Sequence, residues 1–264
     1  DLLHRIITRE RRGHKIRKLK MIGIDEISYC KGRKYATIVY DLERSCVVWI
    51  GKGKARETID RFFKEKLSEY QRKQIVSGCC DMSETFIRAI ERWWPNATLT
   101  LDRFHIVKAL NEASDEVRKE EWRKADKFGK KALKGLRWLL YRHSSNRSEE
   151  DTQTLKSLYM GNRRIHRAWV LKEEFEQIWE FSDIKQADEF LRSWCKTAIR
   201  SRLGSIKRLP RQSKRTKRLL PFVENRLTKA AAEGLNQIIK IVKNRASGFR
   251  NLNAFSDLIY LTIG

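Results

Sequence analysis

Three acidic residues sit at places where carboxylates can do chemistry. Asp25 and Asp81 each end an apolar run, and Glu233 lies in a helix-like stretch over residues 230–236. Carboxylates of this kind can hold two divalent metal ions about 4 Å apart, which activate a water or hydroxyl and stabilise the leaving oxygen of a phosphodiester. Mg²⁺ prefers oxygen ligands and keeps several waters, so three carboxylates suffice as protein ligands. Inside a cationic chain, this pattern indicates a metal-dependent enzyme acting on a polyanion such as DNA.

The two aspartates and the glutamate differ in how strongly the pattern supports them. Adjacent strands can deliver Asp25 and Asp81 to one edge of a sheet, whereas strand alternation puts Glu26 on the opposite face. Glu233 belongs to a helix whose apolar stripe is Leu235, Ile238, Ile239 and Val242. Its own side of that helix carries Asn236, Gln237, Lys240 and Asn244. This side is either a solvent face or part of a site.

Small residues beside Glu233 bear on that choice. Three alanines at 230–232 permit close backbone approach. Gly234 costs about 1 kcal/mol in a helix interior, and such a cost calls for a packing or functional reason.

Asp102 and His105 follow another strand-like segment. Asp102 can cap the next helix, and His105 then lies one turn later on the same side. A lone Asp/His pair supplies too few ligands for zinc. A structural hydrogen bond, or one to a metal ligand, is expected here rather than direct catalysis.

The composition favours a nucleic-acid partner. The chain has 264 residues, 41% of them hydrophobic, and a formal net charge of +25. Such a charge attracts phosphates, although a merely soluble basic surface is the alternative. No apolar run approaches the roughly 20 residues of a membrane span, and no signal peptide is visible. Five cysteines without a C-x-x-C pair indicate neither a zinc ribbon nor a disulfide framework, which fits a reducing cytosol.

Two segments concentrate positive charge. Residues 1–20 form a basic lead, either a short amphipathic helix or an arm. Residues 204–221 form a basic loop that contains no acid between Lys207 and Arg218, and it is either a phosphate-contacting segment or a solvated charge run. The DNA contacts predicted from this loop are Lys214, Arg215, Lys217 and Arg218.

Hydrophobic periodicity and turn residues predict the order β-β-β-α-β-α-β in the first part of the chain. The predicted strands are 21–28, 35–41, 46–50, 75–80 and 97–101, and the helices are 55–70 and 83–94. Short connections imply an antiparallel meander, and the later alternation implies parallel pairing. The fold class is therefore α/β: an RNase H-like mixed five-stranded sheet with flanking helices.

The rest of the chain is expected to be mostly helical. The tryptophans in residues 103–200 are interpreted as core anchors of a helical subdomain rather than a base-stacking platform; they are Trp122, Trp138, Trp169, Trp179 and Trp194. Residues 223–244 form a helix, and 252–263 a helix or strand. The predicted divisions are the lead 1–20, the first core part 21–110, the helical insertion with its basic loop 111–222, and the second core part 223–264.

Several short motifs together resemble one family. They occur in order over nearly the whole chain, in the segments 24–26, 35–37, 81–83, 95–97, 102–105, 232–236 and 243–250. This set resembles bacterial insertion-sequence transposases of the ISL-three type, in the DDE (Asp-Asp-Glu) class. Any one motif alone is weak evidence, whereas the ordered set is specific.

The resemblance implies an RNase H-like DDE domain interrupted by an all-helical insertion between the second Asp and the Glu. It implies Asp25, Asp81 and Glu233 as catalytic residues that bind two Mg²⁺ or Mn²⁺ ions. Asp102 is the rival for the second Asp, and Asp81 is preferred because it ends the fourth strand. For Asp102, His105 and Asn236 we expect hydrogen bonds to the metal ligands. Phosphate contacts beside the site are expected from Lys240, Lys243 and Arg245.

The implied activity is cleavage at transposon ends followed by strand transfer. The implied partners are double-stranded DNA, both transposon ends and target, and further copies of the chain assembled on DNA in the nucleoid of the bacterial cytoplasm, with no membrane partner. The chain departs from the family at Thr228-Lys229, where many members have Thr-Asn, and the family's zinc ribbon and helix-turn-helix have no counterpart in these residues. The alternatives are an RNase H-like nuclease without strand transfer and an inactive, domesticated DNA-binding relative.

Overall fold

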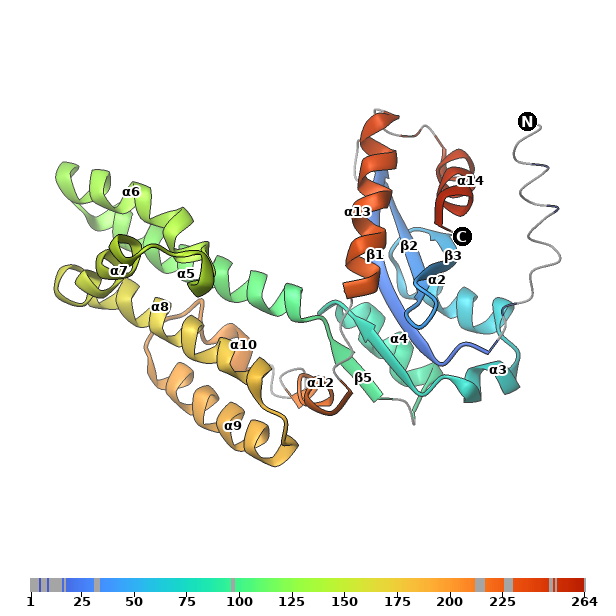
Figure 1. Ribbon diagram of the computed structural model, residues 1–264, viewed down its shortest axis with the longest axis horizontal. Coiled ribbons are helices and arrows are strands. Elements are labelled where there is room, and N and C mark those ends of the chain that lie inside the picture. The colour runs from blue at the N-terminus through green and yellow to red at the C-terminus, as the bar shows by residue number, and fades with distance from the viewer. Residues whose placement is uncertain are drawn as a thin grey trace. The chain divides into compact units, whose positions relative to one another are not determined.

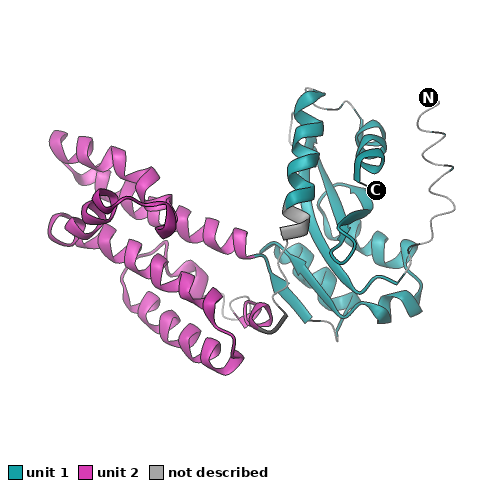
Figure 2. Ribbon diagram, in the orientation of Figure 1, with its two compact units in different colours: residues 1–102, 227–264 teal, residues 103–226 magenta. Residues whose placement is uncertain are grey.

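The computed structural model describes most of the chain, in two compact units (Figure 2). The first unit comprises residues 1–102 and 227–264, and the second comprises residues 103–226. The second unit is therefore inserted, in sequence, into the first. The described residues are 5, 9, 16, 18–30, 34–95, 98–211, 217–225, 230–246, 249 and 251–263. Most of the basic lead lies outside them, and none of the described helices is long and apolar enough to cross a membrane.

The first unit contains a five-stranded mixed sheet (Figure 1). Its strands are β1 Met21–Cys30, β2 Lys34–Asp41, β3 Cys46–Lys52, β4 Ser77–Cys80 and β5 Thr98–Leu101. They lie in the order β3-β2-β1-β4-β5. Strands β1, β2 and β3 pair antiparallel, whereas β4 pairs parallel with both β1 and β5. With the helices on its faces and the helical second unit, this sheet confirms the predicted RNase H-like α/β fold with a helical insertion.

The segment between β3 and β4 differs from its prediction. The expectation of one helix over 55–70 was wrong, because the chain becomes extended at Leu67 and a new helix begins. The elements are α2 Arg56–Arg61, the π-helical turn η1 Phe62–Lys66 and α3 Glu69–Gln74. Ser68 and Gln71 form a reciprocal capping box at the start of α3. Ile75, predicted to begin the strand, instead donates its backbone N–H to Arg72 at the end of α3.

One face of the sheet is covered by α2 and by α4 Glu84–Trp93 (Figure 1). Ile22 and Ile24 of β1 point to this face and are fully buried. The indole of Trp94 packs against Gly78 so closely that a Cβ there would lie 2.7 Å from the ring. A side chain at this position would therefore push the end of α4 away from β4.

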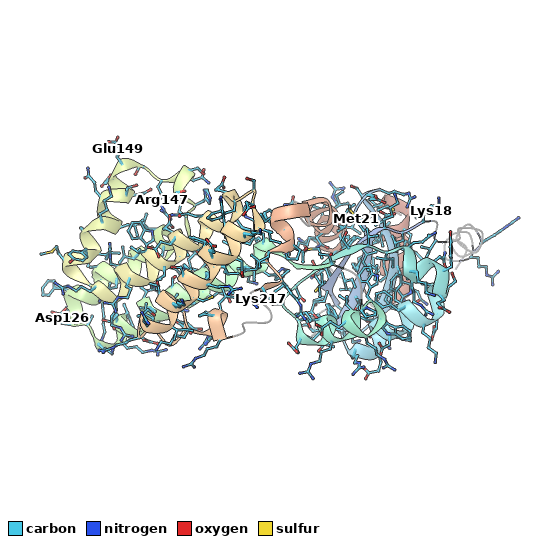
Figure 3. The ribbon with its side chains drawn as sticks, turned by 90° about the horizontal axis from the view of Figure 1, so that it is seen from below. Lys18, Met21, Asp126, Arg147, Glu149 and Lys217 are labelled. Atoms are coloured by element: carbon cyan, nitrogen blue, oxygen red, sulfur yellow. The ribbon has the colours of Figure 1, made fainter. Side chains whose placement is uncertain are left out.

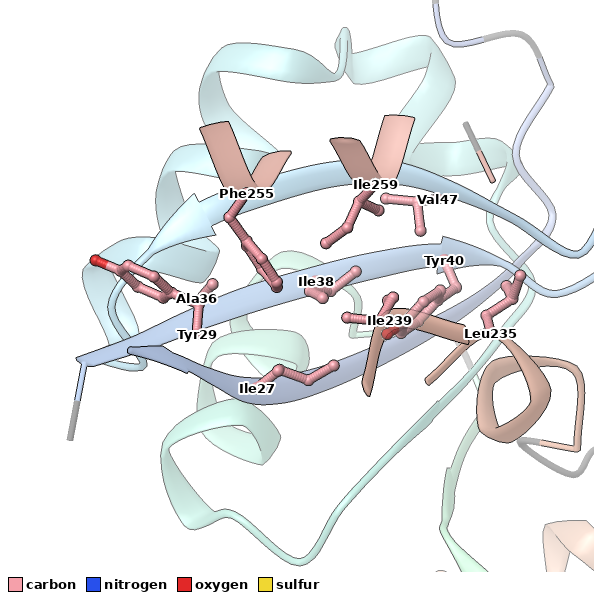
Figure 4. Close-up of a cluster of buried hydrophobic side chains, with 10 residues drawn as sticks. All are labelled: Ile27, Tyr29, Ala36, Ile38, Tyr40, Val47, Leu235, Ile239, Phe255 and Ile259. Atoms are coloured by element: carbon pink, nitrogen blue, oxygen red, sulfur yellow. The ribbon is translucent and has the colours of Figure 1, made fainter. Parts of the chain in front are cut away.

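The opposite face is covered by α13 Ala230–Arg245 and α14 Leu252–Ile263. Residues 252–263, predicted to form a helix or a strand, therefore form a helix. Their apolar side chains form one cluster with those of β1, β2 and β3 (Figure 4). Burying each large side chain contributes about 1.5–3 kcal/mol, so this cluster holds both helices on the sheet. Its members are Ile27, Tyr29, Ala36, Ile38, Tyr40, Val47, Leu235, Ile239, Phe255 and Ile259.

The described part of the second unit is built from helices, as predicted. The longer ones are α5 Arg103–Lys124, α6 Lys127–Tyr141, α7 Glu149–Gly161, α8 Arg163–Glu176 and α9 Ile184–Arg200. Short turns of helix follow at Ser144–Asn146, Gln177–Glu180, α10 Arg208–Arg211 and α12 Pro221–Asn225. The predicted basic loop over 204–221 therefore contains helical turns, with Leu209 and Pro210 buried.

The tryptophans of this unit do not all serve the core. Trp179 and Trp194 are buried and contact Phe175 edge-on, which confirms them as core anchors. Trp138 and Trp122 are 67% and 39% exposed, so the same interpretation was wrong for them. Each lies beside a cation on the surface, Arg137 at Trp138 and Lys130 at Trp122.

Candidate metal-binding active site

Three aspartates follow paired positions of neighbouring parallel strands. Ile24 of β1 pairs with Cys80 of β4, which in turn pairs with Leu101 of β5. The next residues are Asp25, Asp81 and Asp102, and the backbone N–H of Asp102 donates to Cys80 O at 2.9 Å. Neighbouring strands lie about 4.8 Å apart, so the three aspartates follow one another across the sheet at one level. The strand register thus puts Asp25, inside β1, and Asp81, just after β4, at one level, and the convergence of their side chains on one site stays a prediction.

The Asp25 side chain is held from two sides. It is only 9% exposed. Its Oδ1 accepts from the backbone N–H of Glu26 at 2.8 Å, and its Oδ2 accepts from Nδ2 of Asn236 in α13 at 2.7 Å. Because side chains alternate along β1, Asp25 lies on the face covered by α13, together with Ile27.

Tyr40 contacts Asn236 from the other side, and no role was predicted for it from the sequence. Its hydroxyl donates to Oδ1 of Asn236, so the amide of Asn236 bridges Tyr40 and Asp25. Burial, followed by the nearby charge of Asp25, raises the pKa of Tyr40 well above its ordinary value. The phenol therefore stays protonated and serves as a donor. No sequence pattern indicates this contact, since it joins residues 196 positions apart.

Asp81 is fixed by the start of the helix that follows it. Its Oδ1 accepts from the backbone N–H of Ser83 at 2.8 Å, just before α4. This bond occupies Oδ1, whereas Oδ2 makes no hydrogen bond or ion pair with the residues that the structure describes. Asp81 also acts on its neighbour Glu26: burial raises the pKa of the Glu26 carboxyl, Lys54 at 3.5 Å opposes the shift, and the charge of Asp81 adds to it.

Asp102 and His105 lie on either side of the sequence boundary between the two units. Asp102 is 3% exposed and is the last residue of the first unit, while α5 begins at Arg103. His105 is half-buried in the first turn of α5, and its ring contacts Phe104 edge-on. The hydrogen bonds expected from these two residues to metal ligands stay a prediction.

Position 233 lies one helical turn before Asn236 in α13, on the same side of the helix. The Glu233 side chain itself lies outside the described residues. Asn236 was grouped with the helix's polar side, and its bond to Asp25 shows that this side borders the sheet rather than only solvent. Ile238, placed in the apolar stripe, is 36% exposed instead. Among the described residues, nothing lies within 4 Å of a Cβ built on Gly234, so close packing does not account for this glycine.

The basic residues predicted to contact DNA belong to both units. In α13, Lys240 and Arg245 are exposed and Lys243 is half-buried. In the second unit, Lys217 is exposed (Figure 3) and Arg218 is half-buried. Lys214 and Arg215 lie outside the described residues. The structure therefore leaves at least these cationic side chains accessible for phosphate contacts.

The donor atoms at this edge are those that hard divalent cations prefer. Both oxygens of the Asp25 carboxylate accept hydrogen bonds, and Asp81 adds a second carboxylate at the same level of the sheet. Oxygen-only donors fit Mg²⁺ or Mn²⁺ better than metals that favour nitrogen and sulfur. The described residues contain no cluster of three or more His, Cys, Asp or Glu side chains able to hold a metal ion. The Glu233 carboxylate does not belong to the described residues, so it is not counted among these side chains.

Comparison with known proteins gives several relatives of one kind. A transposase for insertion sequence element IS1001 of Bordetella parapertussis is 29% identical over 90% of this chain and 59% of its own length. Transposases for insertion sequence element IS1557 of Mycobacterium tuberculosis, from two strains, are 26% identical over 96% of this chain and 62% of their own length. The chain thus spans about three-fifths of the length of the curated relatives it matches.

A family profile described as "Transposase", of the DDE class and ISL3 type, matches residues 22–259. The match begins in β1, runs through the helical unit and ends in α14. It includes the positions of Asp25, Asp81 and Glu233 together with the sheet and helix that carry them. With most of its length matched in this way, the chain belongs to the ISL3-type family of insertion-sequence transposases.

Proposed function

We propose that this chain carries the catalytic region of a DNA transposase, which cleaves phosphodiesters at transposon ends and joins the freed strand to target DNA. One observation supports this most strongly. The pairing of β1 with β4 brings Asp25 and Asp81 to one level, and Asn236 joins Asp25 to α13, the helix that contains Glu233. Three carboxylates of the proposed site thus come from three elements of one unit.

In this proposal, Asp25 and Asp81 would hold two Mg²⁺ or Mn²⁺ ions, and Glu233 would be a further carboxylate ligand. Ions bound there lower the pKa of a water or hydroxyl and stabilise the leaving oxygen. Asp81 is proposed as the second aspartate rather than Asp102. Its half-buried carboxylate has one oxygen directed by the Ser83 amide, whereas Asp102 is 3% exposed.

The proposed reaction has two phosphodiester steps at one site. Water attacks the phosphorus at the element's end, which breaks the P–O3′ bond and frees a 3′-hydroxyl opposite a 5′-phosphate. That hydroxyl then attacks a phosphorus of the target, forms a new P–O3′ bond and releases the target strand's own 3′-hydroxyl. The chain's own part is to orient Asp25 and to neutralise the phosphates that approach it. We assign the second task to Lys240, Lys243 and Arg245 on α13, and to the basic segment with Lys214, Arg215, Lys217 and Arg218.

The partners in this proposal are duplex DNA and other copies of the chain assembled on it. The helical unit is proposed as an insertion that separates the second aspartate from the glutamate in sequence. Because the chain spans about three-fifths of its relatives' length, recognition of particular transposon ends is left out of the proposal for these residues. The test below therefore supplies pre-cut ends and does not depend on such recognition.

The test follows a labelled duplex ending in a free 3′-hydroxyl, incubated with the chain, supercoiled plasmid and Mg²⁺ or Mn²⁺. Joined products in the presence of metal are expected. Nicked plasmid without joined label would favour the alternative of a nuclease without strand transfer. DNA binding that falls steeply with salt, with no metal-dependent product, would favour a catalytically inactive DNA-binding relative.

A further inference from the structure

Three side chains form a hydrogen-bonded chain between two strands and a helix of the first unit. The hydroxyl of Tyr40 in β2 donates to Oδ1 of Asn236 in α13. Nδ2 of Asn236 donates to Oδ2 of Asp25 in β1 at 2.7 Å. Tyr40 is fully buried and Asp25 is 9% exposed, so water has little access to these bonds. An unpaired polar group at such a place costs about 1–3 kcal/mol, and each bond therefore constrains its neighbours.

The direction of this chain is fixed by its two ends. An ionised carboxylate can only accept hydrogen bonds, so Asn236 must turn its NH₂ group to Asp25. Its carbonyl oxygen then faces Tyr40, which must donate. Without the Tyr40 hydroxyl, Oδ1 of the half-buried Asn236 loses this donor, and the amide loses the partner that favours one of its two orientations. Tyr40 thus acts on Asp25 through Asn236.

The same chain fixes how α13 rests on the sheet. Asn236 lies between Leu235 and Ile239, which are buried in the apolar cluster (Figure 4). Apolar contacts are non-directional and tolerate a small rotation of a helix about its axis. Hydrogen bonds weaken steeply when their distance or angle changes. The bonds from Asn236 to two strands therefore select one rotation of α13, and with it the placement of position 233.

We propose that Tyr40 and Asn236 are positioning residues of the metal site: they hold the Asp25 carboxylate in its metal-binding orientation and set the rotation of α13. This inference rests on the proposed function, because it assigns Asp25 to a divalent metal. It adds a residue, Tyr40, that has no ligand role of its own. Neighbours that orient metal ligands typically contribute about 10- to 100-fold to metal affinity or activity.

The test measures Mn²⁺ binding to the 264-residue chain without DNA, by the loss of the free Mn²⁺ signal in electron paramagnetic resonance. The variants are Tyr40→Phe, Asn236→Ala and the double variant. Tyr29→Phe is the matched control, since Tyr29 is equally part of the cluster but lies at its other end (Figure 4). Thermal unfolding identifies any variant that fails to fold.

We expect Tyr40→Phe and Asn236→Ala each to weaken Mn²⁺ binding about 10-fold or more, and Tyr29→Phe to leave it unchanged. Adding Tyr40→Phe to Asn236→Ala should weaken binding no further, because Tyr40 acts only through Asn236. If Tyr40 only stabilised the fold, the double variant would instead lose Mn²⁺ affinity by the product of the two single factors. If Tyr40→Phe does not fold, wild-type Mn²⁺ affinity of Asn236→Ala alone overturns the proposal.

Failure of this inference and failure of the proposed function have different signatures. If the wild-type chain binds no Mn²⁺ and Asp25→Asn changes nothing, the metal site itself is refuted. If wild type binds Mn²⁺ through Asp25 but a folded Tyr40→Phe variant binds it equally well, only the positioning role is refuted.

Discussion

Asp25 and Asp81 directly follow Ile24 and Cys80, which are register partners in the parallel strands β1 and β4. Both strands run the same way in a parallel pair, so the residues after a paired position lie at the same level of the sheet. The Asn236 bond then ties α13 to the first of these two aspartates. This local geometry, rather than any single residue, is the basis of the expected outcomes below.

Asp25→Asn is expected to abolish metal-dependent cleavage and joining while DNA binding stays near normal. The amide has nearly the shape of the carboxylate but lacks its charge, and it is a poor ligand for a hard divalent cation. Activity on pre-cut duplexes and affinity in a gel-shift titration measure the two properties separately. Glu26→Gln is the matched control, because Glu26 is adjacent in β1 but its carboxylate pairs with Lys54. Wild-type activity of Asp25→Asn would remove Asp25 from the mechanism.

The cations of α13 are expected to bind phosphates rather than bases. Replacing Lys240, Lys243 or Arg245 by alanine should weaken binding to unrelated duplexes by similar factors. Each lost phosphate contact should lower the slope of log affinity against log salt concentration by about 1. The control is Lys73→Ala, which removes a lysine already paired with Glu69 in α3. An unchanged salt slope in all three α13 variants would exclude this surface from the DNA interface.

The stability of the second unit should depend on the ionic cluster of Arg147, Lys172 and Glu173. The ammonium of Lys172 is 1% exposed and lies 2.7 Å from Glu173, which also accepts two hydrogen bonds from Arg147. Glu173→Gln removes the carboxylate that Arg147 and Lys172 share and leaves Lys172 with Glu176 at 3.9 Å, so it should cost about 3–5 kcal/mol of unfolding free energy. Urea titration measures the loss of unfolding free energy. Glu69→Gln is the control: it removes one partner of an exposed ion pair in the first unit and should cause no such loss. A loss no larger than that control would contradict the assignment.

Acid should weaken the same cluster. Burial alone would raise the pKa of Glu173, but the hydrogen bonds from Arg147 and Lys172 outweigh burial and lower it below the ordinary 4.5. A carboxyl whose pKa is lower in the folded state contributes stability that is fully present above the ordinary value and is lost as the pH falls through the folded value. The free energy of unfolding should therefore fall less for Glu173→Gln than for wild type when the pH is lowered from about 5 to about 3.

Gly234→Ala is expected to stabilise the folded chain by about 1 kcal/mol, because alanine favours a helix interior and a Cβ at this position meets nothing within 4 Å in the described structure. Activity gives a second readout on the same variant. If DNA or a target strand must approach the backbone beside Glu233, cleavage falls while stability rises. Gly135→Ala in α6 is the matched control, since a Cβ there also lies more than 4 Å from the other described atoms, apart from those of the adjoining residues and the nearby backbone of α6. Destabilisation by Gly234→Ala would contradict the open geometry of this turn.

Sequence patterns were sufficient for the strands and for the level of two aspartates. Alternating apolar residues and short turns identified all five strands, and the order of helices and strands implied the parallel pairs. The apolar runs before Asp25 and Asp81 were enough to place Asp25 within β1 and Asp81 directly after β4. These signals come from residues close together in sequence, so one sequence is enough to detect them.

The same patterns could not predict contacts between residues far apart in sequence. The bond from Tyr40 to Asn236 joins elements 196 residues apart, and periodicity marked Asn236 only as polar. The exposure of Trp138 was missed because a tryptophan among apolar residues looks like a core residue until its neighbours are known. The break at Leu67 was missed because the apolar spacing continues through it, and the Ser68–Gln71 capping box outweighed that spacing.

The most direct test of the central claim is an anomalous difference map from crystals of the chain soaked in Mn²⁺. The account predicts manganese bound by the carboxylates of Asp25, Asp81 and Glu233. In that case the same map fixes Asp81, not Asp102, as the second ligand. An ordered fold in which these three carboxylates lie more than about 10 Å apart would contradict the account, because two-metal chemistry requires ions about 4 Å from each other.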